Sequence, residues 1–123
     1  MQPDNAVEIL LERVPAFAAA RALDESYMSY DDDDPYLVYG DFARFLRELI
    51  VHKLEATETS DILAQSFRLL SEMANSSNNE LANIAVVGVF EVLADSPEST
   101  AVARKQLSRK ARKVFDRVLR GWI

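Results

Sequence analysis

The chain has 123 residues, 49% of them hydrophobic, which fits one domain that buries a sizeable core without disulfides or metals. It contains no cysteine, and this excludes disulfide scaffolds, cysteine nucleophiles and thiolate metal sites. The net charge of −6 is unevenly distributed, because residues 1–103 carry 6 Lys+Arg against 19 Asp+Glu and residues 104–123 carry 8 against one. No segment resembles a signal peptide or a membrane span, so we expect a cytoplasmic protein with no membrane association.

Apolar residues recur at spacings of three and four along nearly the whole chain. This pattern predicts an all-α fold, a compact bundle of about six to seven short helices in a single domain over residues 1–123. The first helix is predicted to begin near Asp4, and Pro15 disfavours helical geometry at Val14. Pro15 then starts a second, alanine-rich helix that continues to about Glu25.

Residues 27–39 have no helical period and are predicted to form an acidic, tyrosine-rich loop. Asp41 follows Gly40 and is predicted to cap the third helix, which has an apolar stripe through Ile50. A fourth helix is predicted over residues 60–74.

Residues 81–93 are apolar nearly all round, which predicts a helix at the centre of the bundle. Gly88 in this helix favours the close approach of a neighbouring helix. Ser96 and Pro97 have the residue types of an N-cap and a first helical position, so they predict the start of the next helix. The last predicted helix, residues 108–122, has an apolar stripe on one side and basic residues on the other.

The candidate binding surface is the loop at 27–39, because it holds all four tyrosines and four consecutive aspartates. Tyrosines supply amphipathic contact area, and carboxylates accelerate encounter with a basic partner. The alternative is that Tyr36 and Tyr39 anchor the core and the aspartates form a solvated loop. A calcium site is a weaker third interpretation, because the sequence has no D-x-D-x-D-G pattern with a distal glutamate. The predicted partner-binding residues are Tyr27, Tyr30, Asp31, Asp32, Asp33, Asp34, Tyr36 and Tyr39.

The basic C-terminal segment raises a second interpretation, since eight Lys and Arg side chains there could neutralise phosphates. The strongly acidic remainder of the chain repels a polyanion, so the sequence disfavours nucleic acid as a partner. Internal ion pairs or a solvated face are the preferred explanations of these charges.

The sequence contains no recognisable catalytic, metal-binding or cofactor-binding motif, so we expect no enzymatic activity, no cofactor and no metal. His52 is the only histidine, and although Glu48 is four residues away, no nucleophile accompanies them. Glu91, near the end of the apolar helix, is expected to pair with an arginine, either Arg44 or one from the last helix.

A family resemblance is carried by residues 14–17 (VPAF), 38–42 (VYGDF), 79–84 (NELANI) and 89–93 (VFEVL). These segments resemble a family of short bacterial all-helical proteins, described mainly as a domain of unknown function and likened to immunity proteins that neutralise the toxins of competing bacteria. The resemblance implies a small cytoplasmic protein that binds a toxin domain stoichiometrically and without a cofactor.

Resemblance and residue chemistry together predict a protein-binding module, an immunity-type inhibitor whose acidic surface docks on a basic protein partner such as a toxin domain. Two alternatives stay open. One is a nucleic-acid-binding or regulatory module that uses the basic C-terminal helix. The other is a structural or adaptor protein in an oligomer that uses the terminal Trp122 and Ile123.

Overall fold

The computed structural model describes residues 1–23, 34–52 and 57–121, and within them the chain is all-α, as predicted. The predicted end of the second helix at Glu25, and the terminal Trp122 and Ile123, lie outside these residues. The elements are η1 (Pro3–Asn5), α1 (Ala6–Arg13), α2 (Pro15–Leu23), α3 (Pro35–Val51), α4 (Thr57–Ala74), α5 (Asn79–Ala85), the π-helical segment η3 (Val86–Phe90), α6 (Glu91–Leu93), α7 (Pro97–Gln106) and α8 (Arg109–Leu119).

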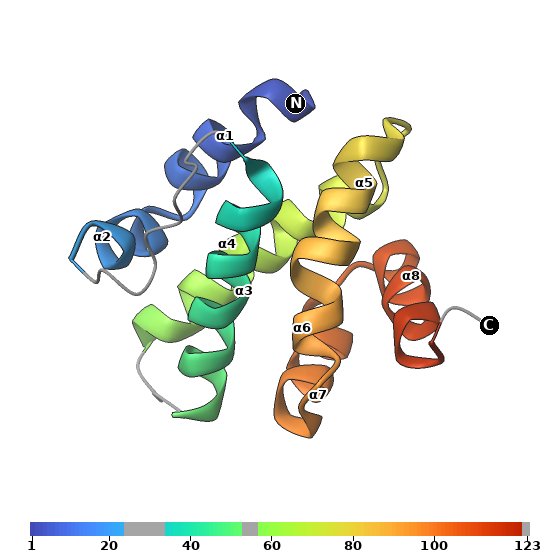
Figure 1. Cartoon of the computed structure of the whole chain (residues 1–123). Coiled ribbons are helices and arrows are strands. Elements are labelled where there is room, and N and C mark those ends of the chain that lie inside the picture. Colours follow the sequence, from blue (N-terminus) through green and yellow to red (C-terminus); the bar gives the residue numbers. More distant parts are fainter. Residues whose placement is uncertain (24–33, 53–56, 122–123) are drawn as a thin grey trace.

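The elements α5, η3 and α6 form one continuous rod that lies beside α3, with α8 on its other side (Figure 1). The rod contacts α3, α4, α7 and α8, so the segment predicted as central is central. Its burial is not complete all round, because Asn83, Val87 and Glu91 form an exposed stripe at a spacing of four residues. The rod is therefore central to the bundle, as predicted, but this one stripe of it is exposed.

Local capping signals explain where several helices begin. The side chain of Asn78 accepts hydrogen bonds from the backbone N–H groups of Glu80 and Leu81. The Ser96 hydroxyl accepts one from the N–H of Ser99, with Pro97 in the first turn as predicted. These side chains satisfy donors that the first helical turn leaves unpaired, so short polar segments determine the starts of α5 and α7.

The third helix begins six residues earlier than the Asp41 cap predicted from the sequence. Asp34 is the N-cap, because its carboxylate accepts a hydrogen bond of 2.9 Å from the backbone N–H of Tyr36, and Pro35 occupies the first turn. Residues 35–39 are helical, so the predicted loop at 27–39 is wrong for this part. Asp41 lies inside α3 and contacts Arg44 at 3.6 Å.

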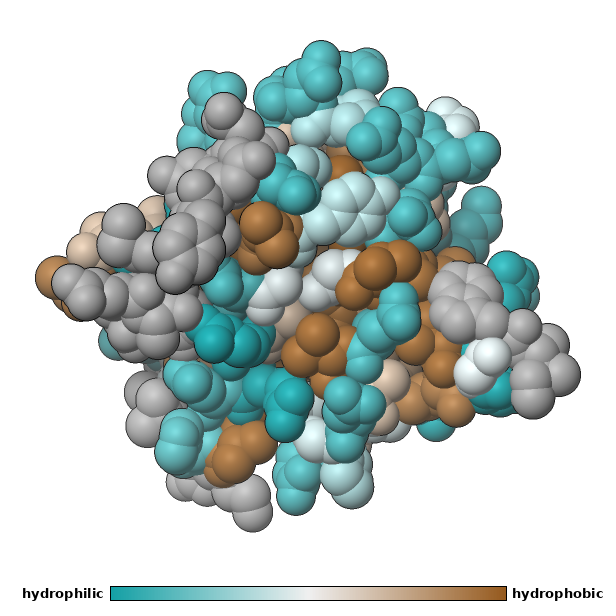
Figure 2. Space-filling view, viewed as in Figure 1, coloured by the Kyte–Doolittle hydropathy of each residue, from teal (hydrophilic) through white to brown (hydrophobic). Residues whose placement is uncertain are grey.

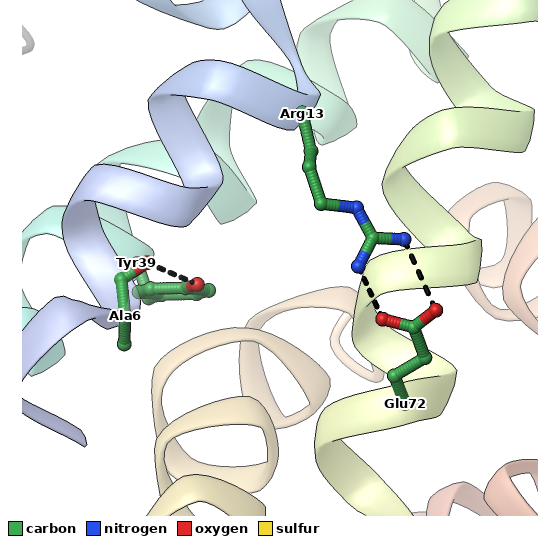
Figure 3. A network of polar contacts seen from close by, with 4 residues as sticks. All are labelled: Ala6, Arg13, Tyr39 and Glu72. Atoms are coloured by element: carbon green, nitrogen blue, oxygen red, sulfur yellow. Dashed lines mark hydrogen bonds and ion pairs between the residues drawn. The ribbon is translucent and has the colours of Figure 1, made fainter. Parts of the chain in front are cut away.

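Two contacts attach α1 to the rest of the bundle (Figure 3). The guanidinium of Arg13 forms a two-fold hydrogen-bonded ion pair with the carboxylate of Glu72 on α4. The hydroxyl of Tyr39 on α3 donates a hydrogen bond of 2.8 Å to the backbone carbonyl of Ala6. The first contact is largely exposed and the second is buried, so we expect the Tyr39 contact to contribute more stability.

Candidate functional site

The structure describes three of the eight predicted partner-binding residues, Asp34, Tyr36 and Tyr39. They lie in different environments: Asp34 is half-buried at the start of α3, Tyr36 is half-buried, and Tyr39 has no exposed surface. The remaining five, Tyr27, Tyr30, Asp31, Asp32 and Asp33, lie outside the described residues.

Tyr39 belongs to the core and not to the binding surface, which corrects the prediction for this residue. Its ring meets Phe42 edge-on at a centroid distance of 6.1 Å, and its hydroxyl is bonded to Ala6. Burial raises the pKa of the Tyr39 hydroxyl well above its usual value, and the positive charge of Arg13 opposes this shift only in part. The core-anchor alternative is therefore the one that fits Tyr39.

The raised pKa of Tyr39 predicts a loss of stability in alkali. Above pH 10 the folded protein keeps the Tyr39 proton, whereas the unfolded chain releases it. The contribution of Tyr39 to the free energy of unfolding is therefore fully present below about pH 10 and falls by about 1.4 kcal/mol per pH unit above it. Replacing Tyr39 with phenylalanine removes this dependence but sacrifices one buried hydrogen bond, at a cost of about 1 kcal/mol.

Urea denaturation of both proteins at several pH values checks this expectation. The wild type should be the more stable at pH 8, and the difference should shrink or reverse by about pH 11. All other titrating groups are common to both proteins, so their effects cancel in the difference. A constant difference across this range would show that Tyr39 ionises equally well in both states.

Tyr36 is half-buried at the surface, and a side chain of the neighbouring rod holds its hydroxyl in place. Its hydroxyl accepts a hydrogen bond of 2.9 Å from the side-chain amide of Asn83. Two apolar side chains of these elements are also exposed. Leu37, the next residue after Tyr36, is 47% accessible, and Val87, four residues after Asn83 on the rod, is 45% accessible. Figure 2 shows apolar surface over the middle of the face on which α3 and the rod lie. A half-buried tyrosine with adjoining apolar surface is suited to contact a protein partner.

A hollow of about 440 Å³ adjoins the start of α3 and is lined by Pro3, Asp4, Val7, Glu8, Pro35 and Glu80. Its three carboxylates are exposed. Within residues 1–23, 34–52 and 57–121, none of these three forms an ion pair. We call this feature the acidic hollow. Of its lining residues, Pro35 directly follows Asp34, the last aspartate of the run, in the chain.

The sequence analysis did not identify Asp4, Glu8 and Glu80 as site residues. The first two belong to the N-terminal segment, and Glu80 lies more than 70 residues further along the chain. Each occupies the first turn of its element, where an acid is favoured by the helix dipole, so the local signal suggests only a structural role. Only the packing of the helices brings the three together.

Other candidates from the sequence prove to be structural or exposed. Burial raises the pKa of the Asp41 carboxyl, while Arg44 and Arg21 oppose that shift. Glu91 is exposed and makes no ion pair with a described residue, so the predicted pairing with Arg44 or with an arginine of the last helix is wrong. His52 is exposed at the C-terminal end of α3.

In the part of the chain that the structure describes, no three His, Cys, Asp or Glu side chains are arranged to hold a metal ion. Among the same residues, none of the helices combines the length and hydrophobicity required to cross a bilayer.

The described residues form an all-α helical bundle, with three exposed acids around the hollow at the start of α3 and half-buried Tyr36 on the same helix. The sequence profile of the family described as "Domain of unknown function (DUF7674)" matches residues 7–122, so the chain belongs to this family. No curated protein and no solved structure matches the chain.

Proposed function

We propose that this protein is a non-enzymatic protein-binding module, an immunity-type inhibitor that docks an acidic surface on a basic protein partner such as a toxin domain. The observation that carries the proposal is the acidic hollow, where Asp4, Glu8 and Glu80 are exposed and unpaired among the described residues beside the start of α3. The proposal combines the acids of this hollow with residues predicted from the sequence, namely the aspartate run, Tyr27, Tyr30 and Tyr36.

Electrostatic attraction provides the first step of this docking. Carboxylates that lack an ion-pair partner within the protein break no ion pair when a basic surface approaches. Their negative charge can therefore attract and orient a basic partner during association. Asp34 contributes charge while its carboxylate also caps α3. We therefore assign the capping role to Asp34 and the main steering role to Asp31, Asp32 and Asp33.

Apolar contact provides the second step. Tyr36 presents an aromatic ring whose hydroxyl is fixed by Asn83, and this limits the rotamer entropy that the side chain loses on binding. Exposed Leu37 on the same helix adds apolar area. Charged side chains that surround a small apolar centre are the usual arrangement of a protein interface.

The test is affinity capture from the native cell, with the captured partner then purified and its association measured at low and high salt. We compare the wild type with two variants: Asp31, Asp32 and Asp33 changed to asparagine, and Asp4, Glu8 and Glu80 changed to Asn, Gln and Gln. Asp34 is retained because changing it alters a helix cap. Each variant should lower the association rate about tenfold or more at low salt and flatten its salt dependence.

A matched control changes the same number of exposed acids elsewhere, Asp61, Glu91 and Asp95, to their amides. This control has the same net charge as either test variant, so it separates local steering from a general charge effect. The proposal fails if the control slows association as much as the test variants do, or if a one-to-one partner binds both test variants at the wild-type rate.

A further inference from the structure

The last helix presents one continuous basic face. Its apolar side, Ala111, Phe115 and Val118, is buried against the core. With about 3.6 residues per turn, positions 109, 113 and 120 fall roughly opposite position 111 on the helix. The cations of this face, which we call the basic face of α8, are Arg109, Lys110, Arg112, Lys113, Arg117 and Arg120, and all except the half-buried Arg112 are exposed.

These cations are not neutralised within the described part of the chain. The one acid of the C-terminal segment, Asp116, is already engaged by Arg104, through contacts of 2.9 and 3.3 Å. No ion pair links a described carboxylate to any of the six cations of the basic face. Of the two explanations that the sequence favoured, internal pairing and a solvated face, internal pairing therefore does not account for these charges among the described residues.

The composition of the basic face discriminates between possible partners. A protein interface requires an apolar or aromatic centre that excludes water, and charged residues are depleted there. Between Arg109 and Arg120 the solvent side of α8 carries cations, and Leu119, 39% accessible, is the exposed large apolar residue of the helix. Interfaces with nucleic acids, by contrast, are strongly positive and polar.

A membrane surface fits less well. An amphipathic helix binds a bilayer by inserting its apolar side. In α8 this side is already occupied, because Phe115 packs edge-on against Phe90 of η3 at a centroid distance of 5.4 Å and is wholly buried.

We infer that the basic face of α8 binds the phosphate backbone of a nucleic acid without reading its sequence. Four of its six cations are arginines, which form two parallel hydrogen bonds to a phosphate. The helix is about 16 Å long, enough to contact several consecutive phosphates of one strand. This site is separate from the acidic surface of the proposed function and does not depend on it.

Fluorescence anisotropy of a labelled mixed-sequence DNA duplex tests this inference, with the full-length protein titrated at about 20 to 200 mM salt. We expect binding at low salt that weakens steeply as salt rises. The double variant Lys113→Gln with Arg117→Gln should lower the affinity about tenfold and reduce the salt slope by about two. Glutamine is a good helix former, so α8 should remain folded, and circular dichroism checks this.

The matched control is Arg44→Gln with Arg47→Gln on α3, which changes the net charge by the same amount. It should bind the duplex within about twofold of the wild type, because these residues lie outside the basic face. A polyglutamate peptide of similar charge serves as an acidic protein competitor. The inference is overturned if the wild type does not bind the duplex at low salt, if the control loses as much affinity as the α8 variant, or if polyglutamate binds as tightly as the duplex.

Discussion

Replacing Phe17 with alanine should lower the free energy of unfolding by about 3–5 kcal/mol, the usual cost of removing a buried aromatic ring. Phe17 is the buried residue of α2, and its ring lies 5.2 Å from that of Phe42 and 5.4 Å from that of Phe45. The substitution removes these aromatic contacts and leaves a cavity between α2 and α3. A domain is typically stable by only about 5–15 kcal/mol, so the loss is a large fraction of the total.

Urea denaturation followed by circular dichroism measures this effect. Phe17→Leu is the control, because it retains most of the buried volume and should cost less than about 1.5 kcal/mol. If Phe17→Ala changed the free energy of unfolding by less than about 1 kcal/mol, the ring would not be what attaches α2 to the bundle.

Where local chemistry determines a helix boundary, the sequence was sufficient to predict it. The break between α1 and α2 was predicted because Pro15 disfavours helical geometry at Val14. The start of α7 was predicted because Ser96 and Pro97 are a capping residue and a proline in the correct order. These signals act over a few residues and require no knowledge of the tertiary packing.

The start of α3 was missed although the same type of signal was present. Asp34 and Pro35 repeat the arrangement of Ser96 and Pro97, but the surrounding charges and tyrosines obscured the helical pattern. What extends α3 to Pro35 is tertiary: Val38 and Tyr39 are buried, and Tyr39 is bonded to α1. Periodicity alone could not show that this first turn faces the core.

The candidate surfaces show the same division between local and tertiary information. The sequence indicated the aspartate run and the basic helix, because charge runs are visible without a structure. It could not show that Asp4 and Glu80 meet at one hollow, nor that Tyr39 points inward. Both depend on how helices distant in the sequence pack against one another.

The same alanine substitution at two helical glycines should have opposite effects on stability. At Gly40 in α3, a Cβ atom would meet no atom within 4 Å beyond its chain neighbours and the adjacent backbone of its own helix, so Gly40→Ala should stabilise the protein by about 0.5–1 kcal/mol. At Gly88 in η3, a Cβ atom would lie 3.1 Å from the Cβ of Tyr39. That contact requires α3 or the rod to shift by a few tenths of an ångström.

Tyr39 has little freedom to make this shift. Its side chain is wholly buried, and its hydroxyl donates a hydrogen bond to the carbonyl of Ala6. Moving Tyr39 therefore disturbs the attachment of α1 as well as the contact between α3 and the rod. Overpacking of this kind costs about 1–3 kcal/mol, more than the roughly 1 kcal/mol that alanine gains over glycine through helix propensity. Gly88→Ala should therefore destabilise the protein by about 1–2 kcal/mol in urea denaturation. If both substitutions raised the stability, the closeness of α3 and the rod at Gly88 would not be a constraint on the fold, and the predicted reason for a glycine in this helix would be lost.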